Sequence, residues 1–591
     1  MKSFFKIFFA SLLALIIFCL IGFFIMAGIA GGLMSSMMNS NKSEIGSKGI
    51  LLLDLTQAYK EQSSENLSLN FSGGSFSKKP GLYDVVQMIH YAKTDSSIKA
   101  IYIKCNDNAN GFAASEELRQ ALQDFKGSKK PVIAYGETIS QKAYYVASAA
   151  DKIYTHPRGG LDWRGYAATL PFFKGLLDKL EIQPQIFYAG KFKSATEPFR
   201  ATEMTDANKL QTQVWLGDLY ASLLLAAQSK SKKFDTAQIH ALANNMTLQT
   251  ADDAVKYYLI DGAKYDDEIK TELHEIVKSS EKETLNFVKF SDYMQAVNYS
   301  NSGKDRIAVI YAEGDIVDGK GEDGQIGSVE FKNLIRKARL DDSIKAIVLR
   351  VNSPGGSALA SDVIWREISL AKKVKPVIVS MSNYAASGGY YISCAADCIY
   401  AEPGTITGSI GVFSMLLNSE DFLKNKLGIT FDGVKTAEHA DMVSSVHKLT
   451  PVEQNYFQSG IDSIYLVFKS RVAEGRHKSM EYIDSIAQGR VWTGVRAQGI
   501  GLVDSIGSLN DAIKYAAAKI KSKSYRIKEY PLPKSIFDQL FRSNNTPEKM
   551  KQDAIAKEIG TEQYELWKQI KALKTMANTP QARLPFDAEV R

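Results

Sequence analysis

A serine near the middle of the second half of this 591-residue chain has the setting of a nucleophile. Ser387 stands in Asn383-Tyr-Ala-Ala-Ser-Gly-Gly-Tyr390, between an apolar run and a predicted helix that begins near Gly388. A serine at a strand-to-helix turn can expose its Oγ beside the free N–H groups of the helix start. The alternative is an N-cap serine, a common structural role that requires the same position.

Two glycines follow another apolar run in the same half. Gly355 and Gly356 close the phrase Arg350-Val-Asn-Ser-Pro-Gly-Gly356. Because glycine has no side chain, such a pair lets the backbone approach a ligand closely and leaves N–H groups free to point at it. Donors of this kind can form an oxyanion hole. The alternative is a plain strand-to-helix turn, since glycine is the usual residue of tight turns.

The chain repeats itself at a spacing of 246 residues (341 − 95). Asp95–Ile101 matches Asp341–Ile347 at six of seven positions. Tyr144–Asp151 matches Tyr390–Asp397 at the same spacing. Agreement of separate blocks at one offset indicates a duplication and not a short-period solenoid.

The duplication predicts two homologous halves between an N-terminal segment and a tail. The halves are residues 48–303 and 304–525, and they are preceded by a membrane anchor and linker, 1–47. The tail, 526–591, is polar and of mixed charge, with helical stretches such as 548–559. The sequence assigns no role to this tail.

Each half is expected to be an α/β unit with largely parallel strands. In the second half, apolar runs at 306–311, 346–351 and 376–381 alternate with helix-like segments at 328–340 and 357–373. Short apolar strands that alternate with helices are typical of βαβ or ββα units. The first half has the same order, with expected strands at 50–54, 100–104 and 131–134.

The two halves differ where chemistry is expected. In the first half, Lys104–Asn110 replaces the phrase that carries the glycine pair, and Gln141 stands at the position of Ser387. The glycines that follow Ser387 are also missing there. The first half has lost the serine and the glycines together. This favours a catalytic role for them in the second half, because a nucleophile and its oxyanion donors work together.

A catalytic serine needs a general base. His439 and His447 lie downstream of Ser387, but nothing around them distinguishes them from surface histidines. A lysine can serve when burial lowers its pKa. Taken alone, Lys191 and Lys193 in the first half would be interpreted as exposed loop lysines, because lysine is mostly exposed.

The N-terminus is predicted to cross a membrane. Residues Ile7–Met34 are almost wholly apolar and uncharged, with Lys2 and Lys6 just before them. The run is longer than the roughly 20 residues that span a bilayer and longer than a secretory signal core. We therefore expect one uncleaved signal-anchor helix with its N-terminus inside. Ala27–Ala30 offers an alternative cleavage site.

Composition excludes several classes of protein. Hydrophobic residues are 45% and charged residues 23%, which excludes a mostly disordered chain and a simple coiled coil. A formal charge of +7 over the whole chain does not indicate a nucleic-acid binder. The four cysteines are too few for a disulfide scaffold, and no HExxH pattern or paired-histidine motif suggests a metal.

Several phrases together resemble the signal peptide peptidase A (protease IV) family in its long, duplicated, membrane-anchored form. The resemblance extends from the anchor to about residue 525. Any one phrase would be weak, since Gly-Gly loops also occur in the wider Clp-protease and crotonase fold. The phrases that carry it are Arg350–Gly356, Ala385–Tyr390, Thr407–Gly411 and Lys193–Phe199.

The resemblance implies tandem Clp-protease/crotonase-like domains and a Ser–Lys dyad. Ser387 falls on the family's nucleophile, and Lys193, from the first half, falls on its general base. The oxyanion would be held by the N–H groups of Gly388 and of the Gly355-Gly356 loop. This explains why the first half keeps a lysine and has given up the serine.

The resemblance also implies partners and a location. The family forms a homotetrameric bowl at the bacterial inner membrane, with the bulk of the chain on the periplasmic side. Its substrates are hydrophobic signal-peptide remnants, and it uses no metal, nucleotide or other cofactor.

Three alternatives stay open on the sequence. Lys435, in Gly433–Thr436, lies roughly where a single-copy enzyme would carry its lysine, so it is a competing base. A crotonase-type acyl-CoA enzyme would use the same fold and oxyanion logic. A non-catalytic membrane scaffold would bind peptides without cutting them.

Overall fold

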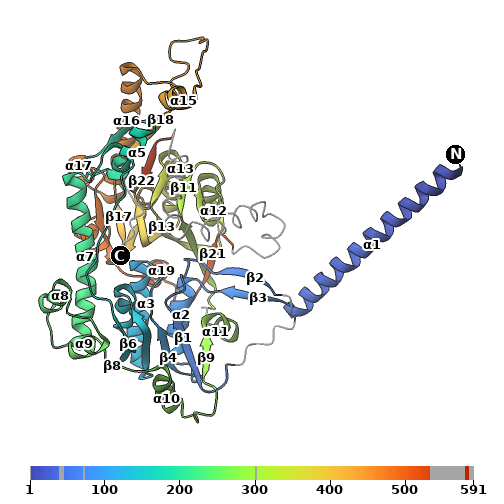
Figure 1. The fold of residues 1–591 in the computed structure, drawn as a ribbon, viewed down its shortest axis with the longest axis vertical. Helices are drawn as coiled ribbons and strands as arrows, with labels where there is room; N and C mark the ends of the chain where they lie inside the picture. Colours follow the sequence, from blue (N-terminus) through green and yellow to red (C-terminus); the bar gives the residue numbers. More distant parts are fainter. Residues whose placement is uncertain (1, 39–44, 71–72, 300–301, 533–578, 585–591) are drawn as a thin grey trace.

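The first element is a long apolar helix at the N-terminus, α1 (Lys2–Met38). It projects away from the rest of the chain in Figure 1. Its segment Lys6–Phe24 is long and apolar enough to cross a membrane, and none of that segment is buried. The apolar N-terminal helix predicted from the sequence is therefore present. The structure is a computed structural model that describes residues 2–38, 45–70, 73–299, 302–532 and 579–584.

The first half folds around a six-stranded sheet in the order β8-β6-β5-β4-β1-β9, and all of its pairs are parallel. The strands at 50–54, 100–104 and 131–134 predicted from the sequence are all present. The bounds are β1 (Gly49–Asp54), β4 (Ile98–Lys104), β5 (Val132–Ile139), β6 (Lys152–Leu161), β8 (Gly262–Ala263) and β9 (Asn286–Lys289).

The second half repeats this sheet. Its strands β21-β10-β13-β15-β16-β20 lie in the order of β9-β1-β4-β5-β6-β8, and β17 and β19 extend the far edge. The predicted strands and both predicted helices are present. The bounds are β10 (Asp305–Glu313), β13 (Ile344–Ser353), β15 (Val377–Ala386), β16 (Cys398–Ala401), β17 (Ile406–Gly408), β19 (Val491–Thr493), β20 (Ser505–Ile506), β21 (Tyr525–Tyr530), α12 (Ser328–Leu340) and α13 (Ala358–Lys372).

A third sheet joins the halves, in the order β12-β11-β14-β22-β18-β7. Strand β7 belongs to the first half and pairs antiparallel with β18 of the second, from Ala189↔Val412 to Gln183↔Asn418. This sheet therefore brings a segment of each half to one place. The bounds are β7 (Gln183–Ala189), β11 (Asp315–Val317), β12 (Gln325–Gly327), β14 (Gly355–Ser357), β18 (Val412–Asn418) and β22 (Gln581–Arg583).

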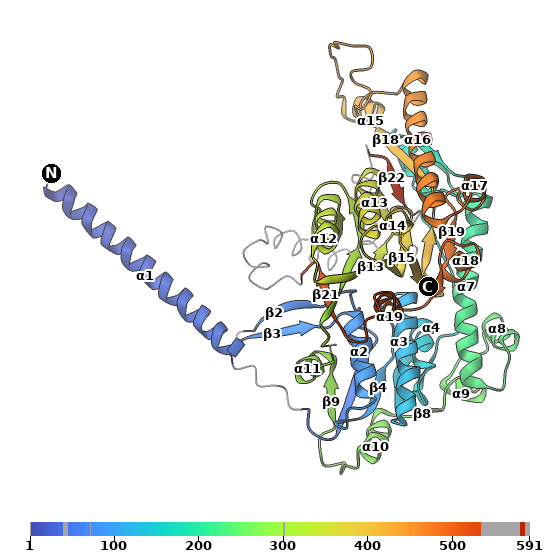
Figure 2. The ribbon, with the colours of Figure 1, turned by 180° about the vertical axis from the view of Figure 1, so that it is seen from behind.

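Helices cover the sheets, and α7 (Asp206–Ser231) runs beside both halves in Figure 2. The first half also contains β2 (Ser64–Asn70), β3 (Gly73–Lys79), α2 (Leu82–Ala92), α3 (Phe112–Phe125), η1 (Lys126–Ser128), α4 (Gln141–Ala147), α5 (Lys174–Lys179), η2 (Ser194–Thr196), α6 (Glu197–Arg200), α8 (Thr236–Asn244), α9 (Ala251–Lys256), α10 (Asp266–Val277) and α11 (Phe290–Ala296). The second half also contains α14 (Gly388–Ser393), α15 (Glu420–Leu427), α16 (Pro451–Arg476), α17 (Met480–Ile486), α18 (Gly494–Gly499) and α19 (Leu509–Lys519).

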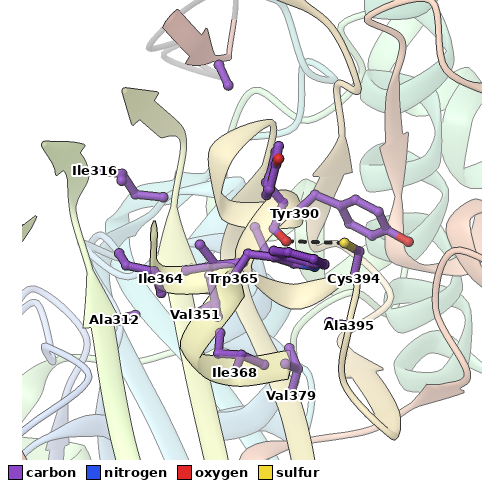
Figure 3. Close-up of a cluster of buried hydrophobic side chains, with 14 of the residues drawn as sticks. Ala312, Ile316, Val351, Ile364, Trp365, Ile368, Val379, Tyr390, Cys394 and Ala395 are labelled. Carbon is purple, nitrogen blue, oxygen red and sulfur yellow. Dashed lines mark hydrogen bonds between the residues drawn. The ribbon is translucent and has the colours of Figure 1, made fainter. Parts of the chain in front are cut away.

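The short helix α14 is packed into the core of the second half. Every residue of α14 is buried, and Figure 3 shows Tyr390 and Cys394 beside Trp365 of α13. The Cys394 thiol donates a hydrogen bond to the Tyr391 carbonyl. Because α14 begins directly after Ser387, this packing holds Ser387 in one position. The predicted helical stretch 548–559 lies outside the described residues.

Candidate active site

Ser387 occupies the sharp turn between β15 and α14. Its backbone has φ 54° and ψ −111°, in a region that residues with a side chain rarely adopt. The Ser387 N–H donates to the Gly408 carbonyl at 2.8 Å, which holds the turn. Although Ser387 stands at the N-cap position of α14, its side chain makes no capping hydrogen bond. Strain of this kind is tolerated where the surroundings enforce it and is common at active sites.

The Ser387 hydroxyl meets a lysine from the other half. Lys193 Nζ lies 2.9 Å from Ser387 Oγ, 3.1 Å from Ser409 Oγ and 3.3 Å from the Ser409 carbonyl oxygen. Ser387 is 0% exposed and Lys193 1% exposed. Burial lowers the pKa of Lys193 well below its usual value, because the ammonium form loses its hydration. A neutral amine beside a hydroxyl is able to accept the hydroxyl proton.

The pairing of a strand of the first half with a strand of the second half brings Lys193 close to Ser387. The pairing of β7 with β18 ends at Ala189, four residues before the lysine. Gly190 follows with φ 108°, and a Cβ there would lie 2.5 Å from the Gln488 carbonyl carbon. The Phe192 N–H then donates to the Gln488 carbonyl at 2.7 Å. The loop therefore runs tightly against the second half and turns Lys193 inward.

The segment after Lys193 is held by buried polar side chains. Gln211 of α7 donates to Ser194 Oγ at 2.9 Å and to the Phe192 carbonyl at 3.1 Å. Glu197 accepts from Asn208 at 2.9 Å and from the Thr205 hydroxyl at 2.6 Å. Sequence reasoning did not assign a role to Ser409 or Gln211. Ser409 belongs to the phrase Thr407–Gly411, which was the only local signal for it.

The glycines singled out in the sequence lie beside Ser387. Gly355 has φ 106°, and a Cβ on it would lie 2.8 Å from the Gly388 nitrogen. A Cβ on Gly388 would lie 3.1 Å from the Gly356 nitrogen. The structure thus brings Gly355, Gly356 and Gly388 together, with the backbone nitrogens of Gly356 and Gly388 beside a small space next to the Ser387 turn. An anionic oxygen in that space would be stabilised by the N–H groups.

A buried arginine supports the strand ends that carry these groups. Arg350 of β13 is 1% exposed, and its Nε lies 2.7 Å from Glu61 of the first half. A second carboxylate of the first half, Glu117, pairs with the same guanidinium. Arg350 also donates to Ser380 and Ser382 of β15. It therefore ties β13 and β15 to each other and to the first half.

The other candidate bases have different partners. Lys191 is exposed. Lys435 is exposed and pairs with Asp441 at 2.6 Å. His439 and His447 both contact the carboxylate of Glu453. The structure thus brings Lys193 to Ser387 and places the competing Lys435 in an ion pair.

One group of side chains has the composition of a metal site. Single ligand atoms of Asp441, His447 and Glu453 lie within 4.8 Å of one another. Each carboxylate already has a protein partner. Lys435 pairs with Asp441, and the Glu453 side chain accepts from the Thr450 N–H in the capping box of α16. The group is thus accounted for as an ion-pair network that closes the start of α16.

The position equivalent to Ser387 in the first half has a structural role. The Gln141 amide donates to the Gly165 carbonyl at 3.0 Å and accepts from the N–H groups of Arg164 and Gly165. Gln141 therefore closes a loop where the second half carries a hydroxyl. The difference between the halves seen in the sequence is reproduced in the geometry.

A strained serine, a buried lysine and a glycine loop on an α/β scaffold define the class of serine hydrolases. The chain belongs to peptidase family S49, whose family model matches residues 124–280 and 369–523, one segment in each half. It is a serine protease. The tandem Clp-protease/crotonase-like α/β fold with an apolar N-terminal helix, predicted from the sequence, is confirmed by the repeated sheets and the two S49 segments.

Three known proteins that match most of this chain are named as proteases. Protease 4 of Salmonella typhi is 37% identical over 540 residues, which are 88% of this chain and 86% of that protein. Protease 4 of Haemophilus influenzae is 36% identical over 500 residues, 81% and 80% of the two chains. The chloroplastic serine protease SPPA of Arabidopsis thaliana is 31% identical over 79% of this chain and 69% of its own. Among solved structures, a ClpP1 mutant from Listeria monocytogenes matches 35% of this chain and 94% of its own, at 17% identity and a TM-score of 0.24.

Proposed function

We propose that this protease is a membrane-anchored endopeptidase that uses Ser387 and Lys193 as a catalytic dyad to degrade cleaved signal peptides. The observation that carries the proposal is the 2.9 Å separation of Lys193 Nζ and Ser387 Oγ in a fully buried setting. Lysine can act as a base only when its amine is neutral, and burial provides that condition.

The dyad would work through an acyl-enzyme. The Lys193 amine takes the Ser387 proton while Oγ attacks the scissile carbonyl carbon. The N–H groups of Gly356 and Gly388 hold the resulting oxyanion. Lys193 then gives its proton to the leaving amine, and a water molecule releases the acyl group by the reverse proton path. Ser409, within 3.1 Å of Nζ, keeps the amine aimed at Oγ.

The apolar helix and the family support the proposed substrate class and location. Helix α1 would hold the protease at a bacterial inner membrane as a single span, where hydrophobic signal-peptide remnants collect. Lys2 and Lys6 favour an inside N-terminus, which places the rest on the periplasmic side. We also propose that the chain forms a homotetramer. We propose that it divides into an anchor and linker (1–47), two repeats (48–303 and 304–525) and a tail (526–591). Strand β21 pairs with β10, so it extends the sheet of the second repeat beyond residue 525.

Activity of matched variants tests the dyad. The full chain in detergent should cleave a fluorogenic signal peptide, and Ser387→Ala and Lys193→Ala should each lose at least about 10³-fold in kcat. A fluorophosphonate should label the wild type and not Ser387→Ala. Circular dichroism should show that both variants stay folded.

Lys435→Ala is the control, because Lys435 pairs with Asp441 outside the proposed dyad. It should keep activity close to the wild type. An active Lys193→Ala together with an inactive Lys435→Ala would overturn the assignment of the base.

A further inference from the structure

A segment from the tail of the chain lies as a strand at the proposed active site. The described segment 579–584 contains β22, which lies between β14 and β18 in the third sheet and is antiparallel to both. The Leu584 N–H donates to the Pro354 carbonyl at 2.8 Å, and the Ala358 N–H donates to the Pro580 carbonyl at 3.2 Å. An added strand of this kind is a common way for proteins to bind an extended peptide.

The register places one carbonyl of this strand at the oxyanion position. Ala582 faces Gly356 in the ladder. The Ala582 oxygen lies 2.0 Å from the point that a Cβ on Gly355 would occupy, and the Gly388 nitrogen lies 2.8 Å from that same point. The Ala582 oxygen also lies 3.0 Å from the Cβ position of Gly388. A side chain on Gly355 would therefore take the place of this carbonyl group.

The side chains of the strand are also accommodated. Ala582 is 0% exposed and is part of the core of the second half. Leu584 is 5% exposed and packs among Trp215, Leu219, Ala386 and Val491. The Arg583 guanidinium pairs with Asp315 at 2.7 Å. Buried apolar contacts and a satisfied charge distinguish this segment from a strand that merely covers a sheet edge.

We propose that residues 579–584 bind as a substrate and that the peptidase cuts its own chain between Ala582 and Arg583. The proposal rests on the proposed function of Ser387 and Lys193. Ser387 Oγ would bond to the Ala582 carbonyl carbon, and the bond from that carbon to the Arg583 nitrogen would break. That nitrogen would leave as an amine with the proton held by Lys193. Water would then release a chain that ends in the Ala582 carboxylate.

The bound strand also defines what a separate substrate must present. The residue before the cut must be small, because Ala582 is enclosed on all sides. The second residue after the cut is expected to be apolar, because Leu584 lies among apolar side chains. Until it is cut, the segment occupies the place between β14 and β18 and competes with other peptides for it.

The test uses the full chain and a peptide of residues 574–590. Mass spectrometry of the purified wild type should show a chain that ends at Ala582, whereas Ser387→Ala should stay intact. The wild type should cut the peptide between Ala582 and Arg583. The same peptide with Ala582→Lys should be cut at least about 100-fold more slowly, because a lysine in a closed apolar site is costly. Ala588→Lys in the peptide is the matched control and should be cut like the parent.

The outcomes separate this proposal from the proposed function. A wild type that cleaves a signal peptide but leaves both its own chain and the 574–590 peptide intact would overturn this inference alone. Equal cutting of the Ala582→Lys and parent peptides would overturn the assigned bond. A wild type that cleaves no peptide, and whose Ser387 is not labelled by a fluorophosphonate, would overturn the proposed function and this inference together.

Discussion

At the scale of single residues, the site depends on what burial does to a lysine. Lys193 Nζ has three oxygen atoms within 3.3 Å, from Ser387 and Ser409. Burial of the ammonium lowers the pKa of Lys193, so the folded chain releases a proton that the unfolded chain keeps. The lysine therefore costs stability at neutral pH, and this cost shrinks as the pH rises toward its unfolded pKa. In return for this loss of stability, the protein has a neutral amine that can act as a base, which an exposed lysine cannot provide.

The pH dependence of the reaction should report this lysine. The value of kcat/KM for a peptide without titrating groups should be low where Lys193 is protonated. It should rise tenfold per pH unit and level off above the lowered pKa of Lys193, well below the value of an exposed lysine. Lys193→Arg should stay inactive up to pH 10, since arginine keeps its proton. A profile that rises only near the pKa of a free lysine would contradict the assignment.

At the scale of elements, a strand pair and a buried ion cluster help to join the two halves. The pairing of β7 with β18 brings the first half to the second, and Arg350 bridges Glu61 and Glu117 to β13 and β15. Burial raises the pKa of Glu117, while the positive charge of Arg350 opposes this effect. The cluster therefore depends on the guanidinium more than on either carboxylate alone.

Removal of this guanidinium should destabilise the fold. Arg350→Met leaves two buried carboxylates without their cation, which should lower the free energy of unfolding by about 3–5 kcal/mol. Urea unfolding followed by circular dichroism measures this loss. Adding Glu61→Gln and Glu117→Gln to Arg350→Met should recover part of it.

The control for this measurement is Arg366→Met, on the exposed side of α13. It should change the unfolding free energy by no more than about 0.5 kcal/mol. Equal stability of the Arg350→Met and Arg366→Met chains would show that the cluster does not hold the halves together.

At the scale of the whole molecule, an apolar helix stands apart from two α/β units that share a sheet. Segment Lys6–Phe24 of α1 has no buried residue, so nothing else in the described chain covers its apolar surface. Such a surface is stable in lipid and costly in water.

Membrane extraction should show whether α1 anchors the chain. The full chain should stay with bacterial membranes in alkaline carbonate, whereas Leu13→Asp with Ile17→Asp should release much of it. Each aspartate at the centre of a membrane helix costs about 2.5–3.5 kcal/mol on insertion scales. Leu13→Ala with Ile17→Ala is the control and should stay in the pellet. Retention of the aspartate variant would contradict anchoring by α1.

Much of this fold could be predicted from local patterns. The strands at 306–311, 346–351 and 376–381 and the helix at 328–340 are present where the sequence places them. Strand and helix periodicities are local, and the duplication supports each assignment twice. The turn at Ser387 was also predictable, because a serine followed by two glycines after an apolar run is a local signal.

Sequence patterns alone therefore predict the duplication, the α/β units, the apolar helix and the Ser387 turn. Local patterns do not distinguish Lys193 from Lys191, two residues away in the same loop, and the family resemblance alone indicated Lys193. The tertiary structure supplies the physical difference, because burial of Lys193 arises from the pairing of β7 with β18. It also placed β22, from the tail, between β14 and β18, although the tail carries no local signal for this role. Desolvation and strand addition depend on segments far apart in the chain, so no local pattern encodes them.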